Sequence, residues 1–152
     1  MTSYLIDINI WLALTWDLHP QHASASAWYA ALNQQDDSSL LFCRMTMLGF
    51  LRLLTNRTVM GDSTITLDNA LSLYDQWIRD PRVELASEPL GIDKRFRRAL
   101  SPVSGQPATK AIADCYLVGF ATAAGAHIVT LDRGLAGMAK RQNVSVAPIR
   151  PV

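Results

Sequence analysis

Three aspartates stand where the surrounding residue types could build an acidic reaction centre. Asp7 ends an apolar run at residues 4–8, and Asp132 ends a second one at 127–132. Asp114 has the apolar neighbours Ala113, Cys115 and Leu117, and an acid in such surroundings is costly to bury unless it is paired or bound to a metal. We therefore treat these three carboxylates as one candidate site.

Carboxylates that converge on one cleft repel each other, and no histidine lies at ligand spacing beside them. A hard divalent cation with oxygen ligands, Mg²⁺ or Mn²⁺, would relieve that repulsion. Such an ion can activate a water and neutralise the charge that develops on a phosphodiester, so the pattern predicts metal-assisted phosphodiester hydrolysis. The alternative for any strand-ending aspartate is a role as a turn or helix cap only.

The elements that must position these acids alternate along the chain. Short apolar runs predict strands, and helical periodicity or capping residues predict the helices between them. The predicted strands are 4–8, 40–42, 83–85, 127–132 and 144–146, the helices are 20–32, 45–54, 66–79, 91–100, 109–124 and 134–140, and 34–39 and 56–63 are a polar connector and a loop. This order predicts an α/β fold with three α/β/α layers and a mainly parallel central sheet. In such a sheet the functional crevice lies past the carboxyl ends of the strands, where Asp7 and Asp132 stand.

Composition narrows the class of protein. The chain has 152 residues, 49% of them hydrophobic, which favours one domain over residues 1–152. The formal net charge is +1, which excludes a bulk electrostatic nucleic-acid binder. The longest nearly apolar run, 115–126, is too short for a bilayer, which needs about 20 residues. Because the N-terminus also lacks a basic signal-like region, we expect a cytoplasmic protein with two buried, reduced cysteines, Cys43 and Cys115.

In a nearly neutral chain, any contact with RNA must come from a local basic patch. The densest run of positive charge lies at residues 94–98, and it is either a solvated helix face or an edge that contacts phosphates. The candidate RNA contacts are Arg52, Lys94, Arg95, Lys110 and Arg133. His19 and His22 are either a metal pair or, with Pro20 between them, the entrance to a helix.

Four segments resemble, in order, the motifs of PIN-domain ribonucleases, and most of all the toxins of VapBC-type toxin–antitoxin modules. These segments are 5–14 (LIDINIWLAL), 42–56 (FCRMTMLGFLRLLTN), 113–121 (ADCYLVGFA) and 129–135 (VTLDRGL). The resemblance implies a PIN fold, a Mg²⁺- or Mn²⁺-dependent endoribonuclease acting as a toxin on RNA, a VapB-type antitoxin as partner, and a homodimer. By the same resemblance, Asp7 and Asp114 would be the main metal ligands and Asp132 would complete the acidic cluster. Asn9 and Thr130 would orient carboxylates or water by hydrogen bonds.

Two positions depart from the family pattern. Met47 stands where many members carry a glutamate, and a soft thioether is a poor ligand for Mg²⁺. Ile8 stands where threonine is frequent. These departures motivate an alternative, a weakened PIN domain that binds RNA or antitoxin without cutting. A flavodoxin-like regulatory domain is a further alternative, which the chain does not favour because it shows no phosphoacceptor pattern beyond a generic aspartate–lysine pair.

Overall fold

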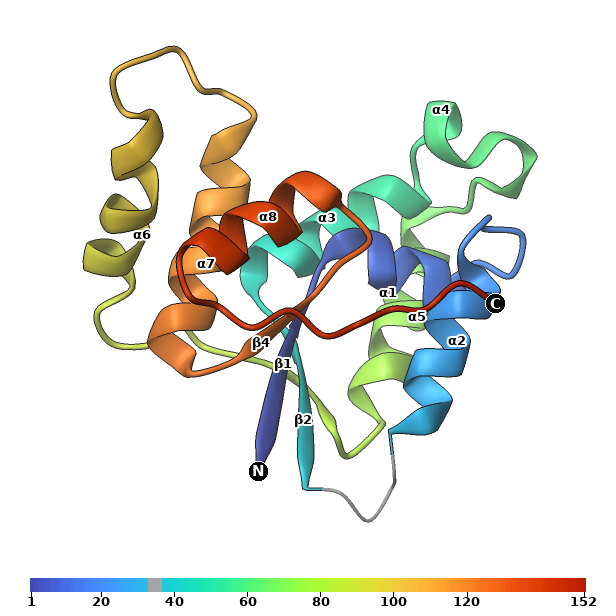
Figure 1. Cartoon of the computed structure of the whole chain (residues 1–152). Helices are drawn as coiled ribbons and strands as arrows, with labels where there is room; N and C mark the ends of the chain where they lie inside the picture. The colour runs from blue at the N-terminus through green and yellow to red at the C-terminus, as the bar shows by residue number, and fades with distance from the viewer. Residues whose placement is uncertain (33–36) are drawn as a thin grey trace.

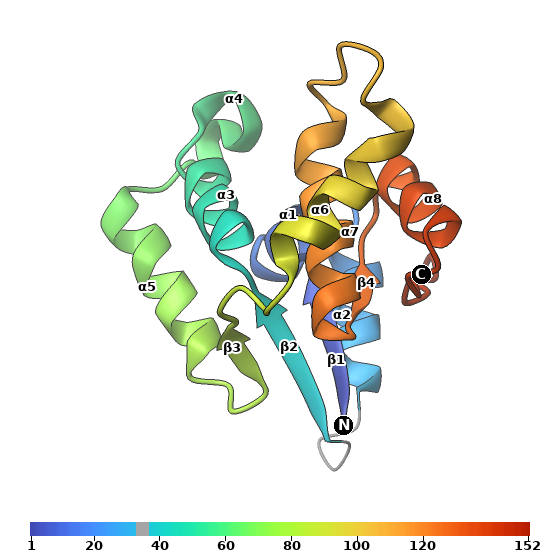
Figure 2. The ribbon, with the colours of Figure 1, turned by 90° about the vertical axis from the view of Figure 1, so that its left-hand side faces the viewer.

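The computed structural model describes residues 1–32 and 37–152, so the predicted polar connector over 34–39 lies partly outside the described residues. Within them, four strands form one parallel sheet in the order β3-β2-β1-β4 (Figures 1 and 2; β3 is labelled in Figure 2). The strands are β1 (Thr2–Ile6), β2 (Ser38–Phe42), β3 (Val83–Leu85) and β4 (His127–Val129). Because all four run the same way, their carboxyl ends meet at one edge.

Alternate residues of the strands face two separate cores. Ile6, Phe42 and Val129 belong to one buried cluster, whereas Leu5 and Ile128 belong to the other. This alternation is what the pleat of a strand dictates, and it explains why the strands read as continuous apolar runs: both faces are covered.

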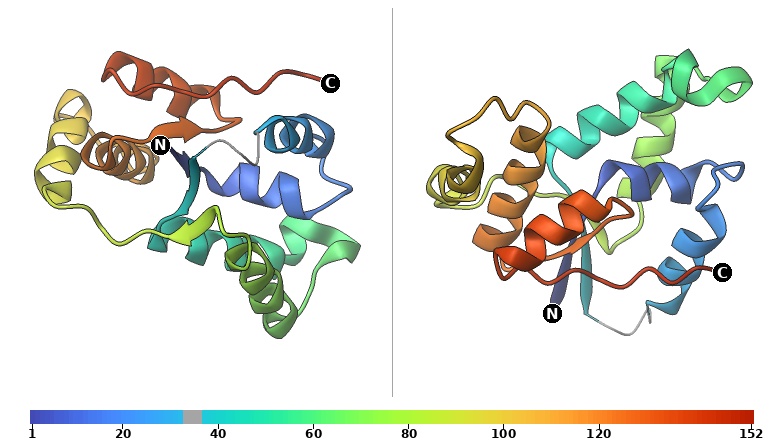
Figure 3. Two further views of the ribbon diagram at one scale, coloured as in Figure 1. Left: turned by 90° about the horizontal axis from the view of Figure 1, so that it is seen from below. Right: turned by 45° about the horizontal axis from the view of Figure 1, so that its top comes forward.

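Helices cover each face of the sheet. The first cluster is completed by α1 (Ile8–Thr15), α2 (His22–Ala31), α3 (Arg44–Leu54), α4 (Arg57–Met60) and α5 (Leu67–Ile78). The second is completed by α6 (Ile92–Leu100), α7 (Ala111–Ala124) and α8 (Arg133–Arg141). Figures 2 and 3 show the strands between these two groups. The predicted α/β architecture with a parallel sheet covered on both faces is confirmed.

The helix α1 is the main element that the sequence did not predict. It begins one residue after Asp7 and buries Ile10, Trp11, Leu12, Ala13 and Leu14 in succession. A helix buried all round lacks the alternation of apolar and polar faces that marks a surface helix, so its periodicity is hidden. Strand β1 accordingly ends at Ile6 and not at residue 8.

Smaller differences occur at other ends of elements. Strand β4 stops at Val129, because the chain from Thr130 turns to enter α8. The predicted strand at 144–146 contributes only a single parallel bridge, from Val146 to Ile128. The predicted loop at 56–63 contains α4, whose N-cap Asn56 accepts backbone N–H groups, and the short 3₁₀ helix η1 (Gly61–Ser63).

The remaining expectations concern cysteines, histidines and membranes. Cys43 and Cys115 are buried free thiols, as predicted. His22 starts α2 and its Nδ1 lies 2.7 Å from the carbonyl oxygen of Ala13, so the pair at 19 and 22 marks a helix entrance. Among the helices of residues 1–32 and 37–152, none is both long and apolar enough to cross a membrane.

Candidate active site

Asp7 is held at the carboxyl end of β1 by bonds to both of its carboxylate oxygens. It is the N-cap of α1, and its Oδ1 accepts the backbone N–H of Ile8 at 2.8 Å. Its Oδ2 accepts the hydroxyl of Thr130 at 2.7 Å. The residue is only 8% exposed. The Asp7 side chain thus caps the start of α1 and is held against Thr130, the residue after β4.

Thr130 links Asp7 to Asp132. Strand β4 pairs with β1 through Ile6 and Val129, which places Thr130 beside Asp7. The Thr130 hydroxyl donates to Asp7 and accepts the backbone N–H of Asp132 at 3.0 Å. This chain of bonds joins residues 123 positions apart in the sequence.

Asp132 caps α8 in the way that Asp7 caps α1. Its Oδ1 accepts the backbone N–H groups of Gly134 at 2.7 Å and Leu135 at 3.1 Å. Capping by a carboxylate is favourable because the helix N-terminus carries partial positive charge. Asp7 and Asp132 are therefore both helix caps, and each carboxylate keeps further lone pairs that could bind a cation.

Asp114 reaches the site from α7, and the packing of that helix fixes its place. A Cβ at Gly119 would lie 2.8 Å from the Cα of Phe96, so the missing side chain lets α6 and α7 pack tightly. Cys115, adjacent to Asp114, is buried with its Sγ 3.4 Å from the carbonyl oxygen of Ala99 on α6 and 3.6 Å from the Sδ of Met138 on α8. Asp114 itself is half-buried in the first turn of α7.

The three carboxylates interact electrostatically. Burial raises the pKa of Asp7, the bonds from Thr130 and Ile8 oppose that rise, and the charge of Asp132 adds to it. Burial also raises the pKa of Asp114, and the charges of Asp132 and then Asp7 raise it further. Across the described part of the chain, no basic side chain forms an ion pair with any of the three. The site is thus a concentration of uncompensated negative charge.

This donor set fits a hard divalent cation that retains water. All the available donors are oxygens, as Mg²⁺ and Mn²⁺ prefer. No group of three or more His, Cys, Asp or Glu side chains within residues 1–32 and 37–152 is arranged to hold a metal ion by itself. Asp7, Asp114 and Asp132 are therefore not arranged as a ready three-ligand metal site, although their oxygens are donors of the type that Mg²⁺ and Mn²⁺ prefer.

The other residues from the family pattern lie differently. Asn9 is exposed in the first turn of α1 and makes no side-chain hydrogen bond within the described residues. Met47 on α3 packs against the first core cluster, and its Sδ lies 3.0 Å from Nη1 of Arg44. The α3 residue that meets Ile8 is Gly49, where a Cβ would lie 2.2 Å from the Ile8 Cδ1. The two departures from the family pattern thus contact different residues of α3: Met47 contacts Arg44, and Ile8 lies against Gly49.

The candidate RNA contacts are all exposed. Their positions are Arg52 on α3, Lys94 and Arg95 on α6, Lys110 at the start of α7 and Arg133 at the start of α8. They come from both helix groups, with Arg52 on α3 and the other four on or beside α6, α7 and α8. No ion pair occupies any of the five within the residues described.

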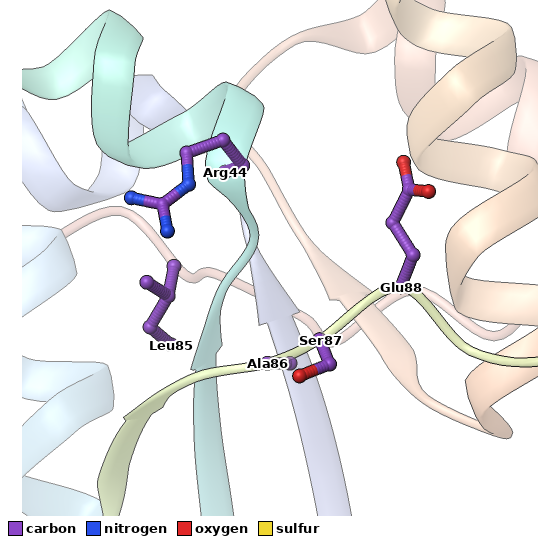
Figure 4. A pocket seen from close by; sticks show the side chains of 5 residues that line it. All are labelled: Arg44, Leu85, Ala86, Ser87 and Glu88. Carbon is purple, nitrogen blue, oxygen red and sulfur yellow. The ribbon is translucent and has the colours of Figure 1, made fainter.

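Glu88 also lies at this sheet edge, and the sequence did not point to it as a site residue. A pocket of about 330 Å³ is lined by Arg44, Leu85, Ala86, Ser87 and Glu88 (Figure 4). Glu88 Oε1 accepts the hydroxyl of Tyr116 on α7 at 2.6 Å. The available signal was positional, because residues 86–88 directly follow a strand, as Asp7 does.

Comparison with known proteins identifies the family. Residues 4–141 match the model of the PIN domain. Ribonuclease VapC41 of Mycobacterium tuberculosis is 39% identical over 132 residues, which cover 84% of this chain and 88% of that relative. The chain belongs to the PIN-domain family, among the VapC ribonucleases.

Solved structures agree with this assignment at the level of the fold. VapBC2 from Rickettsia felis, bound to a DNA fragment from its promoter, matches the PIN-domain chain with a TM-score of 0.67 at 13% identity, covering 96% of this chain and 98% of that one. VapC20 of M. tuberculosis, described as a toxin that cleaves the sarcin–ricin loop, matches with a TM-score of 0.64 at 11% identity, covering 88% and 93%. The PIN fold expected from the four motifs is confirmed.

Proposed function

We propose that this PIN-domain protein is the toxin of a type II toxin–antitoxin module and an endoribonuclease that hydrolyses RNA with Mg²⁺ or Mn²⁺ in the cytoplasm. The observation that carries the proposal is the set of three mutually repelling carboxylates, Asp7, Asp114 and Asp132, at the carboxyl edge of the sheet. None of them has a basic partner within residues 1–32 and 37–152. Membership among the VapC ribonucleases supports RNA as the substrate.

Each side chain has a distinct part in this proposal. Asp7 and Asp114 would hold the ion, and Asp132 would complete the acidic set directly or through water. Thr130 keeps the Asp7 carboxylate oriented through its 2.7 Å hydrogen bond. Asn9 is exposed beside this site and could orient water from there. When bound, the ion would supply an activated water and charge neutralisation at the phosphate.

The partners follow from the same family. The structural neighbours include VapBC complexes from Rickettsia felis and from nontypeable Haemophilus influenzae. We propose a VapB-type antitoxin as the partner of this chain and a homodimer as its assembly. The exposed basic side chains Arg52, Lys94, Arg95, Lys110 and Arg133 would contact the RNA backbone.

The test compares the purified chain, without antitoxin, with Asp7→Asn and Asp114→Asn on structured RNA in the presence of Mn²⁺ or Mg²⁺. We expect both substitutions to abolish cleavage and to weaken Mn²⁺ binding measured by calorimetry. Asp17→Asn, an exposed aspartate in the turn after α1, is the matched control and should retain both.

In this experiment, a loss of cleavage must be distinguished from a loss of folding. Asp114→Asn removes one of three repelling charges, so its stability in EDTA should equal or exceed that of the unmodified chain. RNA binding without cleavage in every protein would instead support the alternative, a PIN domain that binds RNA or antitoxin but does not cut.

A further inference from the structure

The pocket at the ends of β2 and β3 lies in line with the carboxylates. Leu5 pairs with Leu41, Phe42 pairs with Leu85, and the backbone N–H of Ala86 donates to the carbonyl of Phe42 at 2.8 Å. Extending this register by one residue places Ala86, Cys43 and Asp7 in one row across the sheet. Two strand spacings, roughly 10 Å, therefore separate Ala86 from Asp7. A nucleotide next to a phosphate held at Asp7 can reach that far.

The pocket has apolar walls and two oppositely charged groups. Leu85 and Ala86 supply the apolar surface, and Arg44 and Glu88 project from different segments (Figure 4). Within the described residues these two side chains form no ion pair with each other or with any other group. Both charges therefore remain available to a ligand.

Each charged group is nevertheless positioned by a neighbour. The Tyr116 hydroxyl donates to Glu88 at 2.6 Å, which anchors the loop after β3 to α7. The guanidinium of Arg44 contacts the Sδ of Met47 at 3.0 Å. Because Met47 is uncharged, this contact leaves the positive charge of Arg44 without a compensating carboxylate among the described residues.

This combination suits a nucleobase better than a phosphate. The Glu88 carboxylate would repel a phosphate, whereas it accepts N–H donors from a base. Arginine donates to the O6 and N7 acceptors of guanine, and unpaired RNA bases are read on their Watson–Crick and Hoogsteen edges. Guanine is the one common base with two adjacent donors, N1–H and the 2-amino group, on one edge and two adjacent acceptors on another.

We propose that the pocket formed by Arg44, Leu85, Ala86, Ser87 and Glu88 binds a guanine base of the RNA, next to the scissile phosphate. Glu88 accepts the N1–H and 2-amino donors, and Arg44 donates to O6 and N7. The inference rests on the proposed function for its substrate, RNA. It assigns base preference at one position to two named side chains.

The test measures binding in EDTA, so it does not depend on cleavage. The probe is a fluorescent nine-nucleotide RNA of uridines with one guanosine, compared with versions that carry inosine, which lacks the 2-amino group, or 7-deazaguanosine, which lacks N7. We expect each replacement to weaken binding to the unmodified protein by roughly 10-fold, the loss of one hydrogen bond to a charged group.

The variants assign each loss to one side chain. In Glu88→Met, which has no oxygen acceptor, the inosine penalty should disappear while the 7-deazaguanosine penalty stays, and in Arg44→Met the reverse should hold. Glu84→Met, on β3 and hydrogen-bonded to Ser39, is the matched control and should keep both penalties. An unmodified protein that is insensitive to both replacements, or penalties that persist in both pocket variants, would overturn the proposal. A chain that shows these penalties but never hydrolyses RNA would contradict the proposed function alone.

Discussion

At the scale of single residues, the carboxylate of Asp7 is subject to opposing effects on its charge. Its oxygens are bonded to the Ile8 N–H and the Thr130 hydroxyl, which favours the charged form, whereas burial and Asp132 disfavour it. The carboxylate is therefore fixed in direction but remains electrostatically strained, which is a suitable starting state for binding a cation.

The Thr130 hydroxyl can be tested by removing it without changing the volume of the side chain. Thr130→Val leaves the Asp7 Oδ2 and the Asp132 N–H without their partner, so we expect a loss of about 1–3 kcal/mol in the free energy of unfolding. Urea denaturation in EDTA measures this loss without any contribution from metal. Thr130→Ser keeps the hydroxyl and should lose less; an equal loss in both variants would mean that the methyl packing matters and the hydrogen bonds do not.

The position of Met47 makes a second prediction at this scale. Because Met47 lies against Arg44 and the core cluster, a carboxylate introduced by Met47→Glu should pair with Arg44, leaving Mn²⁺ affinity unchanged in calorimetry. Leu48→Glu, at an exposed site on the same helix, is the control for added charge. Tighter Mn²⁺ binding in Met47→Glu alone would give this position a ligand role.

At the scale of elements, the acids of the site are also the residues that begin helices. Asp7 starts α1 and Asp132 starts α8, each by accepting backbone N–H groups of the first turn. The two readings of a strand-ending aspartate, cap and functional acid, are thus compatible in this fold. A substitution at either position affects the start of a helix as well as the charge of the site.

A separate ion pair fixes elements at the opposite end of the sheet. Arg82 bonds Asp80 through Nε at 3.1 Å and Nη2 at 2.9 Å, and the Tyr29 hydroxyl on α2 donates to the same carboxylate. The bonds from Arg82 lead the causes that lower the pKa of Asp80 to about 2. This cluster ties α2 to the turn between α5 and β3.

The lowered pKa of Asp80 fixes the sign of a pH effect. A folded-state pKa below the unfolded value of 3.8 means that the pair stabilises the fold above pH 4, by about 2 kcal/mol, and that this contribution is lost as the pH falls toward 2. The difference in unfolding free energy between the unmodified chain and Asp80→Asn should therefore shrink over that range in urea titrations. Asp93→Asn, which breaks only the exposed pair with Arg97, should change little at any pH. A difference that does not depend on pH would refute the ionic origin of the effect.

At the scale of the whole molecule, the site combines elements from both faces of the sheet. Asp7 belongs to the α1 side, whereas Asp114 and Asp132 stand on helices of the other side. The candidate RNA contacts are divided in the same way. A long substrate would therefore touch both halves of the molecule.

Salt dependence measures how much of the RNA binding comes from the α6 helix. Reversing the charge of Lys94 and Arg95 should lower the slope of log affinity against log salt by at least about 1.4, since each phosphate contact on a single strand contributes roughly 0.7. Fluorescence anisotropy in EDTA at several salt concentrations gives the slope. The same reversal at Arg57 and Arg79, exposed at other places, is the control. An unchanged slope in the Lys94 and Arg95 variant would leave this run as a solvated helix face.

The four strands could be predicted from the sequence because buried parallel strands are short apolar runs. The acids near their ends could be predicted because a charged residue after such a run marks the point where the chain leaves the core. The sequence did not predict α1, since a helix buried on every side shows no amphipathic period. The Arg44–Met47 contact and the hydrogen bond from Tyr116 to Glu88 could not be predicted from the sequence either. They depend on how α3, α7 and the loop after β3 pack in space, which residue types and spacing do not encode locally.

The bond from Thr130 to Asp7 also bears on how the protein is made. A ribosome delivers Asp7 almost at once, but Thr130, which orients it, follows 123 residues later, just after the fourth strand of the sheet. An unfinished or prematurely terminated polypeptide consequently carries the first acid without its companions. If these acids act together as proposed, only nearly full-length copies of the chain would be able to cleave RNA.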